Sequence, residues 1–201
     1  MQQVLYLSRQ AVEEVDLPMG RIIEALDAMF VEKGQGMVEM PPKPGIHTRP
    51  DAFIHAMPAY IPSAGAAGMK WVSGYPENLQ KNLPYISGLL ILNDPETGFP
   101  LSIMDCTWIT AMRTGAATAV AARYLARADS TTVGIVACGV QGRSNLEALS
   151  CVFPLSQVKA YDIDPAAAQR FSEEMSSRLD LEIEIVASPK EAVTGLDLVV
   201  T

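Results

Sequence analysis

The sequence lacks the segments that direct a protein to membranes or to secretion. Residues 1–16 carry Glu13, Glu14 and Asp16 and contain no basic start followed by an apolar run of about 7 to 15 residues, so no signal peptide is predicted. No run of about 18 uncharged apolar residues occurs, which predicts that no segment spans a membrane. The 3 cysteines, an odd number without metal-type pairing, favour a reducing compartment, and we expect a cytoplasmic protein.

Positive charge and metal-binding residues are also scarce. The chain has 15 Lys and Arg against 23 Asp and Glu, and its net charge of -8 has the wrong sign for binding nucleic acid or anionic lipid. The 2 histidines and the scattered cysteines form no recognisable metal site or catalytic Cys-His set, so no metal is expected. With 201 residues, 49% of them hydrophobic, the chain is long and apolar enough for one large domain or two small ones.

Residues 1–129 have the pattern of an α+β domain. Ser8 is placed to cap a short helix, and apolar residues at helical spacing predict a second helix from Pro18 to Gly34. Residues 40–51 contain 4 of the 14 prolines and are predicted to form an irregular, extended segment. Alternating apolar residues then predict an antiparallel meander of strands at 52–57, 68–72, 86–92 and 99–104, and an alanine-rich helix at 107–127.

Residues 130–201 have a different pattern, in which strands alternate with helices. Strands are predicted at 133–137, 158–161, 182–186 and 196–200, and helices at 141–152 and 165–179. This alternation predicts an α/β fold with a Rossmann-type, doubly wound parallel sheet. Such sheets commonly have about six strands, so the sheet is incomplete here, and we expect the chain to be part of a longer protein.

The strongest motif lies where the first of these parallel strands ends. The sequence there is Val133-Gly134-Ile135-Val136-Ala137-Cys138-Gly139-Val140-Gln141-Gly142-Arg143, and Asp162 ends the next strand. The pattern resembles G-x-G-x-x-G, which binds the pyrophosphate of a dinucleotide at a helix N-terminus. Asp162 would accept hydrogen bonds from the adenine ribose and repel a 2′-phosphate, which favours NAD over NADP. The alternative is a nucleotide-free turn in which the glycines only permit close packing.

Two nearby residues qualify this interpretation. Ala137 stands where the first glycine is usual, and a negative φ at this position would make the departure a small one. Asp164, two residues after Asp162, is expected to cap the next helix.

A series of further motifs runs along the whole chain. They are Met57-Pro58-Ala59, Gly68 to Pro76, Asp94 to Pro100, Met104-Asp105, Arg113 to Ala117, Gly139-Val140-Gln141 and Ala160-Tyr161-Asp162. Together they resemble the ornithine cyclodeaminase and mu-crystallin family, and residues 69–127 look most like the archaeal-type alanine dehydrogenases. The resemblance implies an NAD(P)-linked enzyme, usually dimeric, that acts at the α-carbon of an amino acid or its imine. It also implies that residues 1–129 form the substrate-binding and dimerisation domain.

The resemblance assigns roles to individual residues. Lys70 matches the family lysine that contacts the substrate, and a lysine in a desolvated site can exchange a proton with the amine or imine. Arg113 matches the arginine that grips the carboxylate near the cofactor. A second cation for the carboxylate matches Lys43, with Arg49 as the alternative. On the cofactor side, the matching residues are Arg113, Thr114, Gly139, Val140, Gln141, Gly142 and Asp162. The family's catalytic aspartate lies beyond Thr201.

Several positions keep a simpler explanation. Lys70 is also explained as a solvated strand lysine, and Arg113 as the partner of Asp105 in an internal ion pair. His55 is either a substrate contact or a packed histidine. Tyr85 occupies a position where relatives often have a small hydroxyl residue near the cofactor.

The sequence predicts an NAD-dependent amino-acid dehydrogenase that oxidises a small L-amino acid, or reduces an imine, as in alanine dehydrogenase. One alternative is an ornithine cyclodeaminase, which recycles NAD while it closes a ring. The other is a non-catalytic, mu-crystallin-like binding protein or an inactive fragment.

Overall fold

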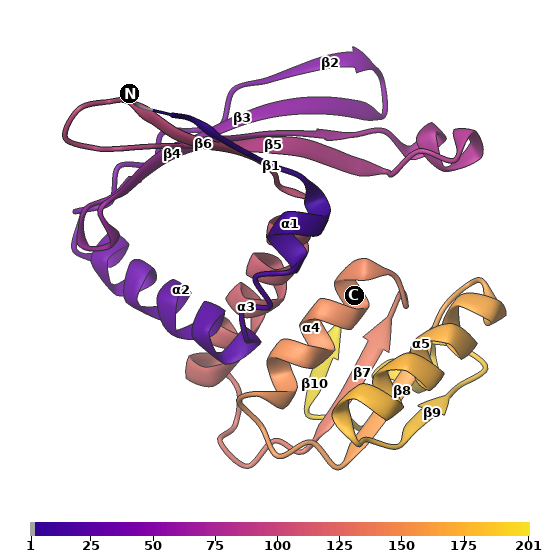
Figure 1. The fold of residues 1–201 in the computed structure, drawn as a ribbon. Coiled ribbons are helices and arrows are strands. Elements are labelled where there is room, and N and C mark those ends of the chain that lie inside the picture. The colour runs from indigo at the N-terminus through magenta and orange to yellow at the C-terminus, as the bar shows by residue number, and fades with distance from the viewer. Residues whose placement is uncertain (1–2) are drawn as a thin grey trace. The chain divides into compact units, whose positions relative to one another are not determined.

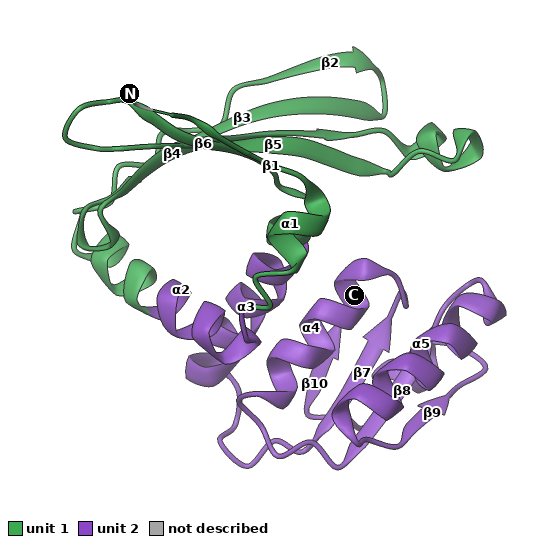
Figure 2. Cartoon of the chain, viewed as in Figure 1, with its two compact units in different colours: residues 1–16, 28–110 green, residues 17–27, 111–201 purple. Residues whose placement is uncertain are grey.

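The computed structural model describes residues 3–201 and divides the chain into two units (Figure 2). The first unit consists of residues 1–16 and 28–110, and the second of residues 17–27 and 111–201. Helix α2, Met19–Gly34, and helix α3, Thr107–Leu125, contribute residues to both units. The predicted domain boundary near residue 130 stays a prediction. Helix α3 precedes that boundary, and most of its residues belong to the second unit.

The first unit contains a six-stranded sheet with the strand order β1-β6-β5-β4-β3-β2 (Figure 1). The strands are β1 Leu5–Leu7, β2 Gly45–Arg49, β3 Ala52–Ile61, β4 Ala66–Gly74, β5 Ile86–Asn93 and β6 Pro100–Asp105. Strands β3 to β6 pair as the antiparallel meander that the alternating sequence predicts. Lys70 lies on β4, which is paired with β3 on one side and β5 on the other.

Two strands of this sheet differ from the sequence-based expectation. The segment predicted to be irregular contains β2, which pairs antiparallel with β3. Every residue of β2 is exposed, so this edge strand has no alternation of buried and polar residues from which to predict it. Strand β1 has only 3 residues and pairs parallel with β6, a contact between segments almost a hundred residues apart.

Helix α1 of the first unit, Arg9–Glu13, begins at the capping residue that the sequence predicts. This residue is Ser8, whose hydroxyl accepts a hydrogen bond from the amide of Ala11 at 3.2 Å. The 3-10 turns η1, Pro62–Ala64, and η2, Pro76–Lys81, follow β3 and β4. The buried carboxylate of Glu32 on α2 accepts hydrogen bonds from the amide and the hydroxyl of Ser63, which ties α2 to η1.

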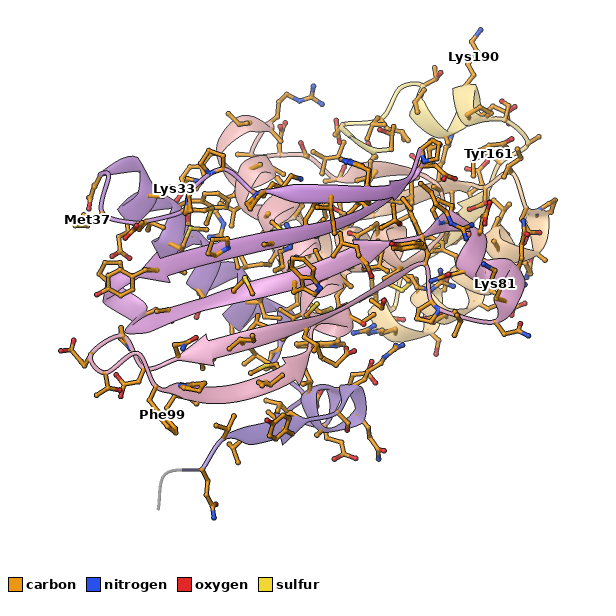
Figure 3. All side chains as sticks on the ribbon, turned by 90° about the horizontal axis from the view of Figure 1, so that it is seen from above. Lys33, Met37, Lys81, Phe99, Tyr161 and Lys190 are labelled. Atoms are coloured by element: carbon orange, nitrogen blue, oxygen red, sulfur yellow. The ribbon has the colours of Figure 1, made fainter. Side chains whose placement is uncertain are left out.

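The register of this sheet gives it two distinct faces. Lys70 and Val72 point to one face, where Val72 is buried. Trp71 and Leu89 are paired neighbours on β4 and β5, point to the other face and are 41% and 48% exposed. Figure 3 shows the sheet from above, on the side away from α1.

The second unit contains a four-stranded parallel sheet with the order β10-β7-β8-β9 (Figure 1). The strands are β7 Thr132–Val136, β8 Gln157–Tyr161, β9 Ile183–Ile185 and β10 Leu198–Val200. The parallel pairing confirms the predicted α/β architecture. The helices are α4 Val140–Ser150, α5 Pro165–Leu179 and the short α6 Pro189–Val193, which the sequence analysis missed. Ser188 caps α6 with its hydroxyl.

The core of the second unit explains why these segments form. It is built from apolar residues of β7, β8, α4 and α5, among them Val133, Ile135, Leu146, Val158 and Phe171, each with 0% exposure. Asp164 caps α5 as expected, since its side chain accepts a hydrogen bond from the amide of Ala166 at 3.0 Å. Among residues 3–201, no helix combines the length and apolar character that crossing a bilayer requires.

Candidate functional site

The turn between β7 and α4 forms with an alanine in a glycine-like conformation. Ala137 has a φ of 79°, and its amide donates a hydrogen bond to the carbonyl of Tyr161 at 2.9 Å. A negative φ would have made the replacement of glycine by alanine a small departure from the motif. The observed φ is positive, so the departure is a substantial one. A left-handed conformation costs an alanine about 1–2 kcal/mol. The turn thus adopts the path of the motif at an energetic cost.

Gly139 occupies the N-cap of α4 in open space. Its φ and ψ are -81° and -158°, and a Cβ atom at this position would meet nothing within 4 Å. In the described part of the chain, no side chain caps α4, so its first amides lack the acceptor that a Ser or Asp would supply. Protein packing does not require a glycine here. The open approach and the uncapped amides fit the pyrophosphate of NAD.

Gly142 has the opposite environment. A Cβ atom there would lie 2.5 Å from the carbonyl oxygen of Ala137 and 3.2 Å from Cγ2 of Ile135. This glycine therefore permits α4 to pack closely on the end of β7. The alternative in which the glycines serve only packing fits Gly142 and does not fit Gly139.

Asp162 lies beside this turn and is already oriented. One carboxylate oxygen accepts a hydrogen bond from the amide of Cys138 at 2.7 Å, and the other from the amide of Asp164 at 2.9 Å. A carboxylate has about four lone-pair positions, so two remain for the hydroxyls of a ribose. Burial, followed by the charge of Asp162, raises the pKa of the Cys138 thiol to about 11, so this buried thiol stays protonated and unreactive.

Arg143 is a residue of the turn that the sequence analysis gave no role. Its guanidinium donates hydrogen bonds to the carbonyl oxygens of Cys138 and Gly139, and it forms an ion pair with Glu174 at 2.7 Å. Its position directly after the third glycine was visible in the sequence. Its partner on α5 was not, because 31 residues separate Arg143 from Glu174.

In the first unit, Lys70 is half-buried on β4 rather than fully solvated. Its amine donates a hydrogen bond to the hydroxyl of Thr110 at 3.4 Å. Burial raises the pKa of the adjacent Cys106 thiol, while a hydrogen bond with Thr110 and the charge of Lys70 act in the opposite direction. Thr110 therefore links the predicted catalytic amine to a buried thiol. No signal in the sequence distinguished this threonine from the others of α3.

Lys43 and Arg49, the two candidates for the second cation, have different surroundings. Arg49 forms an ion pair with Glu77 at 2.7 Å. Lys43 is exposed, and its charge is close enough to contribute to lowering the pKa of His55, after the larger effect of desolvation. His55 also stacks on Phe53 with a centroid distance of 4.4 Å. The choice between Lys43 and Arg49 as the second cation stays a prediction.

Arg113 and Thr114 lie on the part of α3 that belongs to the second unit. Arg113 has an exposed surface, yet the surrounding protein desolvates its guanidinium enough to lower the pKa; an arginine in this situation remains charged. In the first unit, Asp105 accepts hydrogen bonds from the amide and hydroxyl of Thr107 at 2.8 and 3.2 Å. The carboxylate of Asp105 thus holds the start of α3. Tyr85 is 43% exposed, and its predicted place near the cofactor remains a prediction.

The structure thus brings together the predicted cofactor residues Gly139, Val140, Gln141, Gly142 and Asp162 in the second unit. It groups Lys70 with Thr110, and Lys43 with His55, in the first unit. A joint action of Lys70 and Arg113 on one substrate stays a prediction. Within the described residues, His, Cys, Asp and Glu side chains form no group of three or more suited to a metal ion.

Comparison with known proteins identifies the class to which this fold and site belong. Residues 2–201 match the family model described as the ornithine cyclodeaminase/mu-crystallin family. An alanine dehydrogenase from Archaeoglobus fulgidus is 40% identical over 199 residues, which are 99% of this chain and 60% of that protein. The nodulation efficiency protein NfeD of Rhizobium meliloti is 39% identical over 198 residues, 98% of this chain and 61% of that protein.

Two solved structures share the fold. Thermococcus litoralis Δ1-pyrroline-2-carboxylate reductase, solved with NADH and L-proline, is 42% identical, with a TM-score of 0.93 over 98% of this chain and 61% of that one. An archaeal alanine dehydrogenase dimer with bound NAD is 40% identical, with a TM-score of 0.87 over 94% of this chain and 57% of that one. The chain belongs to the ornithine cyclodeaminase/mu-crystallin family. It spans about three fifths of the length of these relatives.

Proposed function

We propose that this protein is an NAD-dependent oxidoreductase that acts at the α-carbon of a small L-amino acid or its imine, as alanine dehydrogenase does. The observation that carries the proposal is the turn after β7, where Gly139 leaves open space before the uncapped N-terminus of α4 and Asp162 stands beside it. Relatives about 40% identical include an alanine dehydrogenase with bound NAD and a reductase with bound NADH. The negative charge of Asp162 disfavours a 2′-phosphate and supports NAD.

The residues of this chain would divide the work between binding and proton transfer. Arg113, whose fork of donors suits a carboxylate, would bind the substrate carboxylate together with Lys43. Lys70 would take a proton from the substrate amine on oxidation and return it to the imine on reduction. NAD, when bound, supplies the oxidant for the α-carbon, and water then releases the 2-oxo acid and ammonia from the imine. Thr114 would lie near the cofactor phosphates.

The first test is a screen of L-amino acids and cyclic imines by NADH absorbance, together with the variant Lys70→Met. This variant should abolish turnover and leave NAD affinity unchanged, because the turn that would bind the pyrophosphate is formed by Gly139, the start of α4 and Asp162 and does not include Lys70. Lys190→Met is the matched control, since Lys190 is an exposed lysine on α6 (Figure 3). Full turnover by Lys70→Met would reject the role of Lys70. Absence of NAD binding by the unmodified protein would reject the whole proposal.

A cyclodeaminase is the second candidate, and the relatives support it. An ornithine cyclodeaminase from Agrobacterium fabrum is 35% identical over 161 residues, and an L-lysine cyclodeaminase from Streptomyces rapamycinicus is 37% identical over 184 residues. In that reaction the side-chain amine closes on the imine, and NADH does not accumulate. Consumption of ornithine or lysine without a net rise in NADH would favour this candidate. A protein that binds NAD and turns over none of these compounds would be a non-catalytic binding protein.

We also propose that the protein forms a homodimer through the outer face of the first sheet. Trp71 and Leu89 on that face are joined by Ile46 on the edge strand, which is 55% exposed. Exposed apolar residues that cluster on one sheet face are typical of protein contacts. A second copy is the occupant we favour, because the archaeal alanine dehydrogenase relative is a dimer. Light scattering should give twice the chain mass, and Trp71→Glu should give the monomer; a monomeric unmodified protein would exclude the proposal.

A further inference from the structure

Arg143 makes contacts that the binding of a cofactor does not by itself explain. It is the first residue after Gly142 on α4, and one of its terminal nitrogens donates hydrogen bonds to the carbonyl oxygens of Cys138 and Gly139, the latter at 3.3 Å. Its Nε atom bonds Glu174 on α5 at 2.7 Å. The guanidinium also lies over the ring of Phe171, 5.5 Å from its centroid. An arginine that stands beside a phosphate site therefore directs its donors at the protein backbone.

The anchor of this arginine is rigid. Phe171 has 0% exposure and belongs to the core of the second unit, so its ring cannot move freely. Phe171 and Glu174 are three residues apart on α5 and therefore lie on the same side of that helix. The side chain of Arg143 is itself only 24% exposed. The core of the unit thus fixes the guanidinium, and the guanidinium contacts the turn.

Holding a carbonyl oxygen also orients an amide. A peptide bond is planar and trans, so its N–H points away from its C=O. The carbonyl of Cys138 belongs to the same peptide as the amide of Gly139, and the carbonyl of Gly139 to the same peptide as the amide of Val140. Because Arg143 binds both carbonyls, it directs both amides to the opposite side of the turn. Those amides are the donors that the start of α4 offers to an anion.

The turn needs such a restraint because of its composition. Gly139 has no side chain and no neighbour within 4 Å of its Cβ position, so packing does not limit its conformation. Ala137 has a strained φ of 79°. Asp162 fixes the peptide before Cys138 through its amide, at 2.7 Å, and Arg143 fixes the two peptides that follow. Two side chains thus hold three consecutive peptides: Asp162, which follows β8, and Arg143 on α4.

We propose that Arg143 is a positioning residue, which fixes the turn of Cys138 and Gly139 in the conformation that receives the pyrophosphate of the dinucleotide and is itself held by Glu174. The inference rests on the proposed function, because it assumes that the dinucleotide binds at this turn. Arg143 acts through the two carbonyl oxygens and not by direct contact with phosphate. The rival explanation is that Arg143 leaves Glu174 and binds the phosphate as an ordinary cation.

The carboxylate partner separates the two explanations. If Arg143 is a positioning residue, Glu174→Gln weakens its anchor and lowers the affinity for NAD, in the same direction as Arg143→Met. If Arg143 binds phosphate directly, Glu174→Gln frees the guanidinium, and the affinity stays the same or rises. Affinities for NAD, ADP-ribose and adenosine are measured by calorimetry. Adenosine carries no pyrophosphate and reports on the ribose and adenine contacts alone.

We expect Arg143→Met to lower the affinities for NAD and ADP-ribose about tenfold, because the turn must then become ordered during binding. The affinity for adenosine should stay within about twofold of that of the unmodified protein. Glu174→Gln should weaken the same two ligands by about threefold, and the double variant should be no worse than Arg143→Met. Arg178→Met is the control, since Arg178 and Glu147 form another ion pair between α5 and α4, also at 2.7 Å. Its affinities should equal those of the unmodified protein.

Four results would overturn the inference. Unchanged affinity for NAD in Arg143→Met would show that the turn needs no restraint from this residue. Unchanged or tighter binding in Glu174→Gln, with weaker binding in Arg143→Met, would assign Arg143 to direct phosphate contact. An equal loss of adenosine binding would show that Arg143 supports the fold of the unit in general. No binding of NAD or ADP-ribose by the unmodified protein would overturn the proposed function together with the inference.

Discussion

The two glycines at the start of α4 predict opposite effects of the same substitution. At Gly142, an added methyl group would lie 2.5 Å from the carbonyl oxygen of Ala137 and 3.2 Å from Ile135 Cγ2. At Gly139, an added methyl group would meet nothing within 4 Å. Gly142→Ala should therefore damage the fold, whereas Gly139→Ala should mainly affect what binds in the open space.

The cost at Gly142 follows from what the methyl group meets. The carbonyl oxygen is backbone, and it can move only if Ala137, already at a φ of 79°, moves with it. Overpacking costs typically about 1–3 kcal/mol, and the backbone contact places this variant near about 3 kcal/mol. Alanine regains about 1 kcal/mol of helix propensity over glycine, which leaves a net loss of about 2 kcal/mol. For a chain of this size, the melting temperature should fall by about 4–8 °C.

At Gly139, the expected change in stability is smaller and the change in binding larger. Alanine is a poorer N-cap than glycine, which costs at most about 1 kcal/mol, and the φ of -81° suits an alanine. The methyl group would occupy the space through which a phosphate reaches the first amides of α4. We expect the affinity for NAD to fall at least about tenfold, or about 1.4 kcal/mol.

Two measurements test this pair of expectations on the unmodified protein and both variants. They are thermal unfolding and calorimetric titration with NAD. Titrations run well below the melting temperature of Gly142→Ala separate loss of fold from loss of binding. NAD affinity in Gly139→Ala equal to that of the unmodified protein would refute the location of the pyrophosphate at this turn. A stable Gly142→Ala would refute the close contact between α4 and β7.

Three other substitutions test single interactions. Thr110→Val, which removes the hydroxyl bonded to Lys70, should lower turnover about tenfold and shift the pH–rate profile, while Thr110→Ser should keep both near those of the unmodified protein. Ala137→Gly should relieve about 1–2 kcal/mol of strain and lose about 0.4–1 kcal/mol through the unfolded chain, so the urea midpoint should rise slightly. The pKa of Asp197 is lowered by hydrogen bonds, first from the amide of Thr131 and then from the side chain of Thr132, so this carboxylate stabilises the fold fully above its ordinary pKa of 3.8 in the unfolded chain. This contribution to the free energy of unfolding is lost as the pH falls through the lower pKa of the folded protein. In urea unfolding, Asp197→Asn should therefore lose less stability over the same fall in pH than the unmodified protein.

Local sequence patterns predicted the parts of the fold that depend on neighbours along the chain. The turn between β5 and β6 is an example, since the carboxylate of Asp94 accepts hydrogen bonds from the amides of Glu96 and Thr97 at 2.8 and 3.3 Å, and Gly98 has a φ of 71°. The capping of α5 by Asp164 is another. Each of these interactions spans five residues or fewer, so the residue types alone define it.

Features that depend on distant segments escaped prediction. Strand β1 forms only because β6 offers it an edge, and 3 residues carry too little pattern to be recognised. The roles of Thr110 and Arg143 depend on partners that are 40 and 31 residues away. A threonine in an alanine-rich helix and an arginine after a glycine have many ordinary explanations. Only the folded chain shows which partners they meet.

The three positions of the glycine motif impose three different physical demands, which explains why one of them tolerates an alanine. The first position needs a positive φ, which Ala137 adopts at a cost in conformational energy. The second position, Gly139, leaves open space, where we propose that the dinucleotide binds, and the third needs the close contact with β7 that Gly142 allows. Strain can be compensated by other interactions, such as the hydrogen bond from the amide of Ala137 to Tyr161. A collision with backbone or an occupied binding site cannot be compensated in this way, so the departure from the motif falls at the position where it does least harm.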